Sequence, residues 1–279
     1  MDIQWYPGHM AKARRLVEQN LKLVDVVIEL LDARVPRSSR NPVINKIIGD
    51  KPRLSVLNKA DLADKNLTQI WARLLGTNGL CPVVNSRTGR GLNKVPDAVV
   101  NLARPKIKVT PSGRMRPVRC MIVGIPNVGK SLFINSLVRR KVTRTGNKPG
   151  VTKGQQWIRV NKRVELLDTP GILWPKFEDP EVGFRLAAIG AIKEEVYSIE
   201  NVAVRLIEWL ETNYSGVLKE HYDLPGYEGI NDMLEQLAHK RGFIISGGRV
   251  DIYKASVHIL KEFREGKLGC FTLDLPPER

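Results

Sequence analysis

The chain has 279 residues and a hydrophobic content of 42%, which suit one large globular domain or two modest ones. No apolar run comes near the roughly 20 residues that span a bilayer, and the N-terminus lacks the apolar core of a signal peptide, so we expect a cytoplasmic protein without a membrane segment. The net charge of +16 favours a polyanionic partner, and the three cysteines and four histidines show no metal-ligand spacing, which argues against a structural metal.

Helices and strands alternate over the first 167 residues. Residues 25–31 (DVVIELL) form a continuous apolar run, which is typical of a strand buried in a parallel sheet. We expect helices over 10–23, 67–75, 91–102 and 131–138, and strands over 25–31, 53–57, 81–84, 118–123, 155–160 and 163–167. Residues 104–117 are basic and rich in Pro and Gly, which indicates a linker. This alternation predicts an α/β fold with a mostly parallel sheet, right-handed crossovers and helices on both faces.

The strand signal fades after about residue 180. Four helices are expected there, over 182–192, 199–212, 230–241 and 250–264, separated by Gly, Pro and Tyr. The end, 270–276, is either a short strand or an extended tail. We therefore predict an α/β domain over 1–177 and an all-α domain over 178–279.

The segment 124–131 (GIPNVGKS) fits the pattern of a phosphate-binding loop, with a predicted strand before it and a helix after it. Its glycines let the backbone curl so that N–H groups point at the β-phosphate. Lys130 would bridge the β- and γ-phosphates, Ser131 would bind Mg²⁺, and the helix N-terminus would face the anion. The predicted nucleotide contacts of this loop are Pro126, Asn127, Val128, Gly129, Lys130, Ser131 and Leu132.

Two further segments point to the γ-phosphate. Residues 168–171 (DTPG) end an apolar strand about 40 residues after the loop, so that Asp168 can reach Mg²⁺ and the Gly171 N–H can bond the phosphate. Thr152 lies between the two segments and is the natural second hydroxyl for Mg²⁺. Lys130, Thr152 and Gly171 are therefore candidate catalytic residues.

Residues 58–61 (NKAD) predict the choice of base. The Asp61 carboxylate can accept hydrogen bonds from N1–H and the exocyclic amine of guanine, and because adenine offers neither donor, ATP should be rejected strongly. The stem of Lys59 can lie along the base, and Asn58 belongs to the same motif. Asn85, Ser86 and Arg87 follow the next predicted strand, where backbone N–H groups would support the guanine O6.

The excess charge is concentrated in one part of the chain. Residues 98–164 hold sixteen Lys and Arg and no acid, whereas the rest carries 29 basic and 29 acidic side chains. One nucleotide cannot use sixteen cations, and solubility alone does not require excluding acids over such a length. RNA is the leading candidate for the partner, and neutralising the cluster Arg139, Arg140 and Lys141 would test this link. Acidic membrane lipid is less favoured, because the sequence shows no basic amphipathic helix with a broad apolar face.

The motifs of a GTPase are thus all present, but the guanine motif precedes the phosphate loop. In this order the chain resembles the circularly permuted GTPases of the ribosome biogenesis GTPase A (YlqF/RbgA) family. The likeness includes the start 5–10 (WYPGHM), similar to that family's WFPGHM. It implies a permuted phosphate-loop GTPase domain with an all-α C-terminal domain. The implied activity is GTP hydrolysis, with a bacterial role in late assembly of the large (50S) ribosomal subunit.

The resemblance also implies partners. These are the large subunit, which would stimulate hydrolysis, and its rRNA; we expect no DNA partner, no membrane and a monomer. Mitochondrial ribosome-assembly relatives share the motifs, so an organellar counterpart is an alternative. The permuted order joins the all-α domain directly to the segment that senses the γ-phosphate, and we expect GTP to control how that domain binds RNA.

Two positions bear on catalysis. Ile172 stands directly after 168–171, where many GTPases have a water-orienting Gln, so slow intrinsic hydrolysis is expected. In the family an N-terminal histidine is the proposed substitute, which corresponds to His9; otherwise His9 is only a turn residue beside Pro7 and Gly8. In related GTPases an Asn at the position of Asn127 accompanies K⁺ stimulation, which makes Asn127 a candidate K⁺ ligand.

Other functions remain open. Because Ile172 cannot orient water, the chain could be an RNA-binding scaffold that holds GTP with negligible turnover. Against this, four residues of the site are intact, namely Lys130, Ser131, Thr152 and Asp168. A GTP-dependent tRNA or membrane-transport enzyme would need an additional catalytic motif or a membrane segment, and the sequence shows neither.

Overall fold

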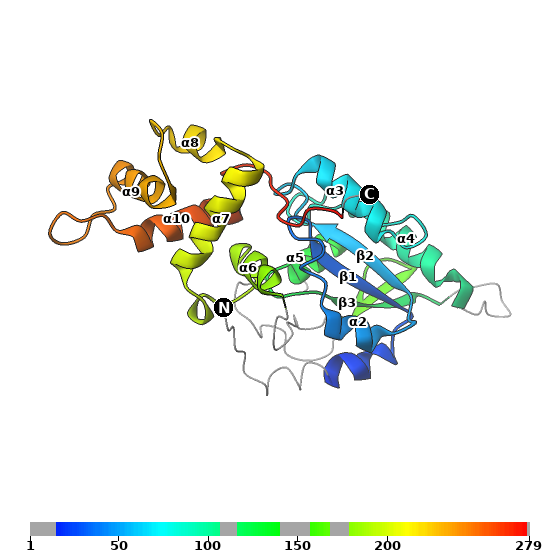
Figure 1. Cartoon of the computed structure of the whole chain (residues 1–279). Coiled ribbons are helices and arrows are strands. Elements are labelled where there is room, and N and C mark those ends of the chain that lie inside the picture. The colour runs from blue at the N-terminus through cyan, green and yellow to red at the C-terminus, as the bar shows by residue number, and fades with distance from the viewer. Residues whose placement is uncertain (1–14, 107–115, 140–156, 168–178, 278–279) are drawn as a thin grey trace. The chain divides into compact units, whose positions relative to one another are not determined.

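The computed structural model describes residues 15–106, 116–139, 157–167 and 179–277 (Figure 1). These residues fall into two compact units. The sheet unit comprises the described residues up to 167 together with those from Asp274 onward, and the helical unit comprises 179–273. The last described residues of the chain therefore belong to the sheet unit.

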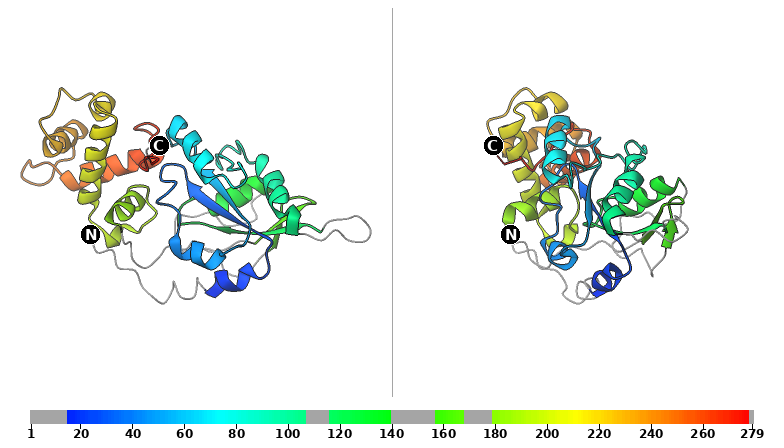
Figure 2. Two further views of the ribbon diagram at one scale, coloured as in Figure 1. Left: turned by 45° about the vertical axis from the view of Figure 1, so that its right-hand side comes forward. Right: turned by 90° about the vertical axis from the view of Figure 1, so that its right-hand side faces the viewer.

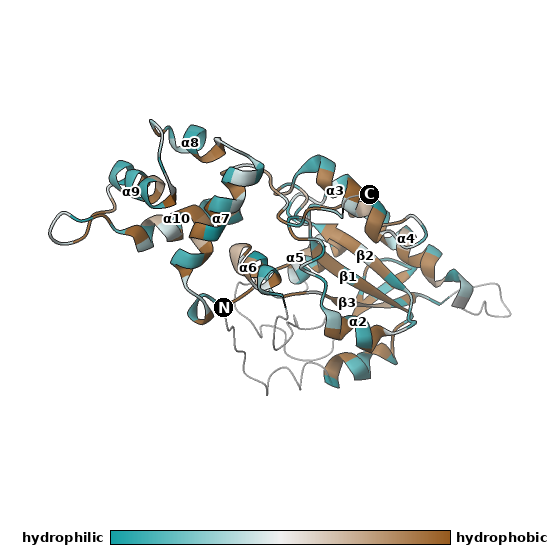
Figure 3. Ribbon diagram, in the orientation of Figure 1, coloured by the Kyte–Doolittle hydropathy of each residue, from teal (hydrophilic) through white to brown (hydrophobic). Residues whose placement is uncertain are grey.

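The sheet unit contains a five-stranded sheet in the order β2-β1-β3-β5-β4. All neighbours are parallel except β4, which pairs antiparallel with β5. The strands are β1 (Val26–Asp32), β2 (Arg53–Asn58), β3 (Val118–Val123), β4 (Trp157–Arg159) and β5 (Val164–Leu167). Every residue of β1 is buried, as its apolar run predicts, and β1 to β3 are hydrophobic over most of their length (Figure 3).

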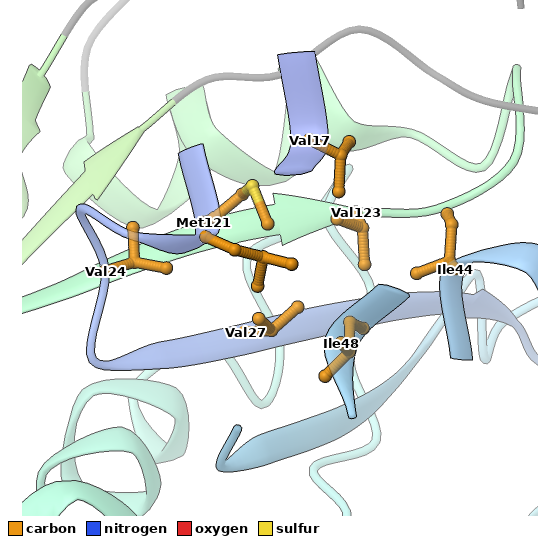
Figure 4. Close-up of a cluster of buried hydrophobic side chains, with 8 residues drawn as sticks. Val17, Val24, Val27, Ile44, Ile48, Met121 and Val123 are labelled. Carbon is orange, nitrogen blue, oxygen red and sulfur yellow. The ribbon is translucent and has the colours of Figure 1, made fainter. Parts of the chain in front are cut away.

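Helices cover both faces of this sheet, as predicted (Figure 2). They are a helix over 15–21, α2 (Pro42–Ile48), α3 (Lys65–Leu75), α4 (Lys94–Ala103), which continues into a 3₁₀ turn (Arg104–Lys106), and α5 (Lys130–Val138). On one face Val17 and Ile44 pack with Val27 and Met121 in a core cluster (Figure 4). A second core cluster joins Trp71 of α3 to Leu31 of β1 and Leu57 of β2. α4 packs against β1, β2, β3 and β5.

The helical unit is built from five α-helices and a 3₁₀ turn within the described residues. They are α6 (Pro180–Ala188), the turn Glu194–Val196, α7 (Ile199–Asn213), α8 (Val217–Tyr222), α9 (Ile230–Arg241) and α10 (Ile252–Glu265). α10 packs on α7 and α9, and α7 also contacts α6 and α8. The Asp179, Ser198 and Asp251 side chains accept N–H bonds at the starts of α6, α7 and α10, and Gly242 and Gly266 end α9 and α10 in the left-handed conformation.

Three features differ from the sequence prediction. The strand expected over 81–84 is wrong: it is a single bridge between Leu57 and Val83, because Pro82 has no N–H to extend the ladder. The short helices α2 and α8 were not predicted, although Asn41 before Pro42 is a helix-start signal. The helix expected over 182–192 ends at Ala188, shortly before Gly190, whose φ of +74° is left-handed. The tail over 270–276 contains no strand, which agrees with the extended alternative.

Candidate nucleotide site

The phosphate loop follows β3 and leads into α5. Two of its glycines are required by close approach to other segments. A Cβ on Gly124 would lie 2.5 Å from the Leu30 carbonyl oxygen, and a Cβ on Gly129, whose φ is +100°, would lie 2.7 Å from the Asn58 side-chain nitrogen. No larger residue fits at either position without moving β1 or the guanine motif.

Lys130 is the first residue of α5 and folds back across the loop. Its Nζ donates to the carbonyl oxygens of Gly124 at 3.0 Å and Ile125 at 2.8 Å. This holds the Lys130 ammonium against the backbone of the loop, and Ser131 follows it as the second residue of α5. The arrangement suits a polyphosphate. Asn127 is exposed on the same loop and has a left-handed backbone, with φ of +57°.

Asn58, at the end of β2, connects three segments that are far apart in the chain. Its Nδ2 donates to the Val128 carbonyl at 2.8 Å, and its Oδ1 accepts from the Ser86 N–H at 3.1 Å and the Ser86 hydroxyl at 2.7 Å. The Ser136 hydroxyl of α5 donates to the Ser86 carbonyl at 2.6 Å. The predicted guanine motif, the loop after it and the phosphate loop therefore meet, despite their permuted order.

The loop that carries Asn85, Ser86 and Arg87 is shaped by its own side chains. The Asn85 Oδ1 accepts the N–H groups of Arg87 at 2.8 Å and Thr88 at 3.0 Å. Asn85 and Ser86 are buried, whereas Arg87 is exposed. A Cβ on Gly91, whose φ is +81°, would lie 2.3 Å from the Val83 carbonyl oxygen, so only glycine lets this loop close against the sheet.

Lys59 and Asp61 follow Asn58 in a tight turn. The Ala60 N–H donates to the Val84 carbonyl at 3.2 Å, and Lys59 has a left-handed backbone with φ of +58°. The Asp61 residue is exposed, so that its carboxylate is accessible to a base. The Lys59 ammonium pairs with the buried Asp32 at 3.0 Å. Sequence reasoning missed Asp32, although its position at the end of a buried strand was a signal.

Pro126 of the phosphate loop is half-buried, and Leu132 of α5 is exposed. Four predicted site residues lie outside the described residues. They are His9, Thr152, Asp168 and Gly171. Within the described ranges, no group of three or more His, Cys, Asp or Glu side chains is arranged to hold a metal ion. None of the helices in those ranges is long and apolar enough to cross a bilayer.

Some cations of the acid-free stretch have structural partners. Arg116 makes two hydrogen bonds to Asp25, at 2.7 and 2.8 Å. Burial raises the pKa of Asp25, but its bonds to Arg116 and to the Arg119 N–H outweigh this and leave that pKa below its usual value. Arg119 lies 5.0 Å over the Trp157 ring, and Arg163 pairs with Asp97. Part of the basic stretch therefore stabilises the fold.

Comparison with known proteins supports the motif interpretation. The profile of a family described as 50S ribosome-binding GTPase matches residues 119–206. The chain is 50% identical to ribosome biogenesis GTPase A of Bacillus cereus, over 100% of this chain and 95% of the relative. It is 36% identical to mitochondrial ribosome-associated GTPase 1 of Mus musculus, over 97% and 90% of the two chains.

Solved structures extend the likeness to three dimensions. A crystal structure of GNP-bound YlqF from T. maritima matches with a TM-score of 0.68 at 26% identity, covering 96% of this chain and 100% of that one. A GDP-bound structure of YlqF matches with the same TM-score at 25% identity, over 95% and 100%. The predicted fold class, a circularly permuted phosphate-loop GTPase with a helical C-terminal region, is thereby confirmed. The chain belongs to the ribosome biogenesis GTPase A family and is a GTPase of ribosome assembly.

Proposed function

We propose that this protein binds GTP with Mg²⁺ and hydrolyses it while docked through rRNA on a maturing large ribosomal subunit, which activates it. The observation that carries the proposal is the contact of Asn58 with both Ser86 and Val128. It supports a single site in which the guanine motif and the phosphate loop serve the same nucleotide. The name of the matched family, 50S ribosome-binding GTPase, supports the choice of subunit.

Within this site Asp61 selects guanine, and Lys130 faces the β- and γ-phosphates. The fit for Mg²⁺ rests on Ser131, whose hydroxyl stands at the start of α5 directly after the loop-bound Lys130. Thr152 and Asp168 complete the proposed Mg²⁺ ligands. When bound, Mg²⁺ neutralises charge on the phosphates. The Gly171 N–H holds the γ-phosphate in this proposal.

Two features set the proposed rate. Ile172 cannot orient a water molecule, so hydrolysis is slow in the free protein, and His9 supplies the missing function when the subunit is bound. Asn127, exposed on the phosphate loop, takes K⁺ as an additional ligand, which neutralises developing charge on the transferred phosphate.

The proposed RNA contacts come from both units. In the sheet unit they are Arg139, an exposed residue that ends α5 with φ of +57°, and the neighbouring Arg140 and Lys141. In the helical unit, exposed cations lie on and between α9 and α10, and Tyr253 of α10 is 54% exposed. They are Lys240, Arg241, Arg249, Lys254 and Lys261. Exposed cations that can bind phosphates, together with an exposed aromatic ring on the same helices, are a combination that suits RNA.

One assay tests the whole proposal. GTP turnover is measured with and without purified large subunits, in KCl and in NaCl, for the wild type and for His9→Ala. We expect strong stimulation by subunits in KCl, less in NaCl, and loss of stimulation but not of GTP binding in His9→Ala. Absence of stimulation by subunits would contradict the proposal and favour a GTP-holding scaffold. Equal rates of GTP turnover in the two salts would contradict only the proposed role of K⁺.

A second assay addresses the RNA contacts. Subunit binding is compared for the wild type and for a variant in which Arg139, Arg140 and Lys141 are replaced by Gln, in the GDP state and with a non-hydrolysable GTP analogue. We expect weaker binding with a smaller salt dependence in the variant, and different affinities in the two nucleotide states. Unchanged affinity in the variant would show that this cluster does not contribute to subunit binding.

A further inference from the structure

A buried charge cluster lies at the end of β1, beside the guanine motif. Asp32 is the last residue of β1 and is fully buried. Its Oδ1 accepts from the Arg34 Nε at 3.0 Å and the Arg34 N–H at 3.1 Å, and its Oδ2 accepts from Arg34 Nη2 at 2.9 Å. The Lys59 Nζ lies 3.0 Å from the same Oδ2. One carboxylate therefore holds two cations, of which one belongs to the guanine motif.

The sheet register places these groups together. Asp32 and Asn58 are direct partners in the parallel pair of β1 and β2, and the Ala33 N–H donates to the Asn58 carbonyl at 2.9 Å. Lys59 is thus the first residue after this pairing ends, and its left-handed backbone directs the chain out of the sheet. With the ammonium fixed on Asp32, the four-carbon stem has few remaining conformations. The Lys59 side chain is 23% exposed, so part of it remains accessible.

We propose that Asp32 is a positioning residue for base recognition, which holds Lys59 so that its stem forms a preformed platform for guanine. This inference rests on the proposed function of 58–61 as the guanine-reading motif. A lysine side chain has many rotamers, and a ligand that must order it loses affinity. Asp32 and Arg34 order it before the nucleotide arrives, and Arg34 adds the second positive charge that keeps the carboxylate ionised.

Electrostatics agree with this geometry. Burial raises the pKa of Asp32, but the adjacent charges of Arg34 and Lys59 outweigh it, so that the pKa lies far below its usual value. Burial lowers the pKa of Lys59, and the Asp32 charge opposes that shift. The carboxylate is therefore ionised at neutral pH, and neutralising it would leave the Lys59 ammonium without this charge partner.

The chain offers a matched control on the same strand. Glu29 is a buried acid of β1 that also pairs with two arginines, Arg40 at 3.4 Å and Arg53 at 3.7 Å. It has no ion pair with Lys59 among the described contacts. Glu29→Gln therefore removes the same kind of charge from the same strand without touching the guanine motif.

The experiment measures binding of a fluorescent GDP and, by calorimetry, of inorganic triphosphate, which probes the phosphate loop alone. The full-length variants are Asp32→Asn, Lys59→Met, the double variant and Glu29→Gln. We expect Asp32→Asn to weaken GDP binding roughly 10- to 100-fold, the range for losing a bond to a charged group, with triphosphate binding unchanged. Glu29→Gln should change GDP binding less than about twofold. In the Lys59→Met background, Asp32→Asn should add little, because both act on one platform.

Several results would overturn the proposal. They are unchanged GDP affinity in Asp32→Asn, an equal loss of triphosphate binding, or effects of the two substitutions that multiply in the double variant. If Asp32→Asn does not fold, Asp32→Glu carries the same test, because it keeps the charge but displaces the Lys59 ammonium. Failure of the proposed function looks different: the wild type itself would then bind GDP no better than ADP.

Discussion

The two units differ in how deeply their long-range polar contacts are buried. The bonds from Arg264 of α10 to the Ala187 and Ala188 carbonyls span 77 and 76 residues within the helical unit, but they are only part-buried. In the helical unit, Ser198 and Asp251 cap α7 and α10 from positions within three residues of the N–H groups they accept. In the sheet unit, buried side chains join segments 28, 70 and 236 residues apart, through Asn58 and Asp274. The starts of helices α7 and α10 are thus marked by local signals, whereas the nucleotide site depends on buried contacts that exist only once the sheet unit is folded.

The largest expected effect comes from removing the Asn58 side chain, which bonds to Val128, 70 residues away in the chain. Asn58→Ala leaves the buried Val128 carbonyl and the buried Ser86 N–H without the hydrogen bonds that Asn58 makes to them. We expect a loss of at least roughly 100-fold in GDP affinity and about 3 kcal/mol of stability in the sheet unit. GDP titration and denaturant unfolding measure the two effects.

The control for this prediction is Asn101→Ala, an exposed asparagine of α4. It should change stability by less than about 0.5 kcal/mol and leave GDP affinity unchanged. Equal effects of the two substitutions would mean that the three-way contact of Asn58 contributes nothing specific to the site.

The same contrast explains what could be predicted from the sequence. The helices over 199–212 and 230–241 match α7 and α9 to within one residue, because their periodicity and end signals are local. The phosphate loop was also predictable, since a strand and a helix flank its pattern. Asp274 was not predictable, and the position of Asp32 after an apolar run indicated a buried acid without indicating its partners, because a carboxylate's role depends on the groups that the fold brings to it. Val83 forms only a bridge and not a strand, because Pro82 limits the pairing. This effect is local, but the hydrophobic periodicity of 81–84 does not reveal it.

The next largest effect concerns the end of the chain. The Asp274 carboxylate accepts the Ser38 N–H and hydroxyl, both at 2.7 Å, and the Trp71 indole donates to the Asp274 carbonyl at 2.8 Å. Ser38 is buried, so Asp274→Ala leaves two donors without this acceptor and should cost about 2 kcal/mol. Hydrogen exchange over residues 33–41 and denaturant unfolding would measure the loss.

Trp71→Phe is the matched comparison, because it removes only the bond to the backbone carbonyl and keeps a large aromatic ring. We expect a cost of about 1 kcal/mol, smaller than that of Asp274→Ala. If Asp274→Ala leaves exchange over 33–41 unchanged, the tail does not stabilise the sheet unit, and the contrast between the two units loses its longest contact.

The helical unit should instead respond to pH. Burial lowers the pKa of His258 below its ordinary 6.5. The unfolded chain then binds more protons below that pH, so the unit loses stability as pH falls from 6.5 toward the folded pKa. For Glu262, burial raises the pKa, but hydrogen bonds to His221 and Tyr222 outweigh this effect and leave the pKa below its ordinary 4.5. Its contribution is present above 4.5 and is lost as pH falls through the folded pKa.

We expect each loss to stay below about 1 kcal/mol, because these groups are partly solvated. Hydrogen exchange in α10, corrected for the intrinsic effect of pH, would measure it. His258→Gln should flatten the change between pH 7 and 5.5, and the control His239→Gln, an exposed residue of α9, should not. A flat profile for the wild type would contradict the prediction.

The smallest expected effect tests whether burial or distance along the chain decides how much a polar contact stabilises the sheet unit. Arg163 pairs with Asp97 at 2.5 Å across 66 residues, a span similar to that between Asn58 and Val128, but both side chains are more than half exposed. Asp97→Asn should therefore cost less than about 1 kcal/mol, including the few tenths that an acid adds in the first turn of α4. Denaturant unfolding at low and high salt would show the loss shrinking as ions screen the pair. A loss as large as that of Asp274→Ala, unaffected by salt, would mean that long-range contacts stabilise the sheet unit whether or not they are buried.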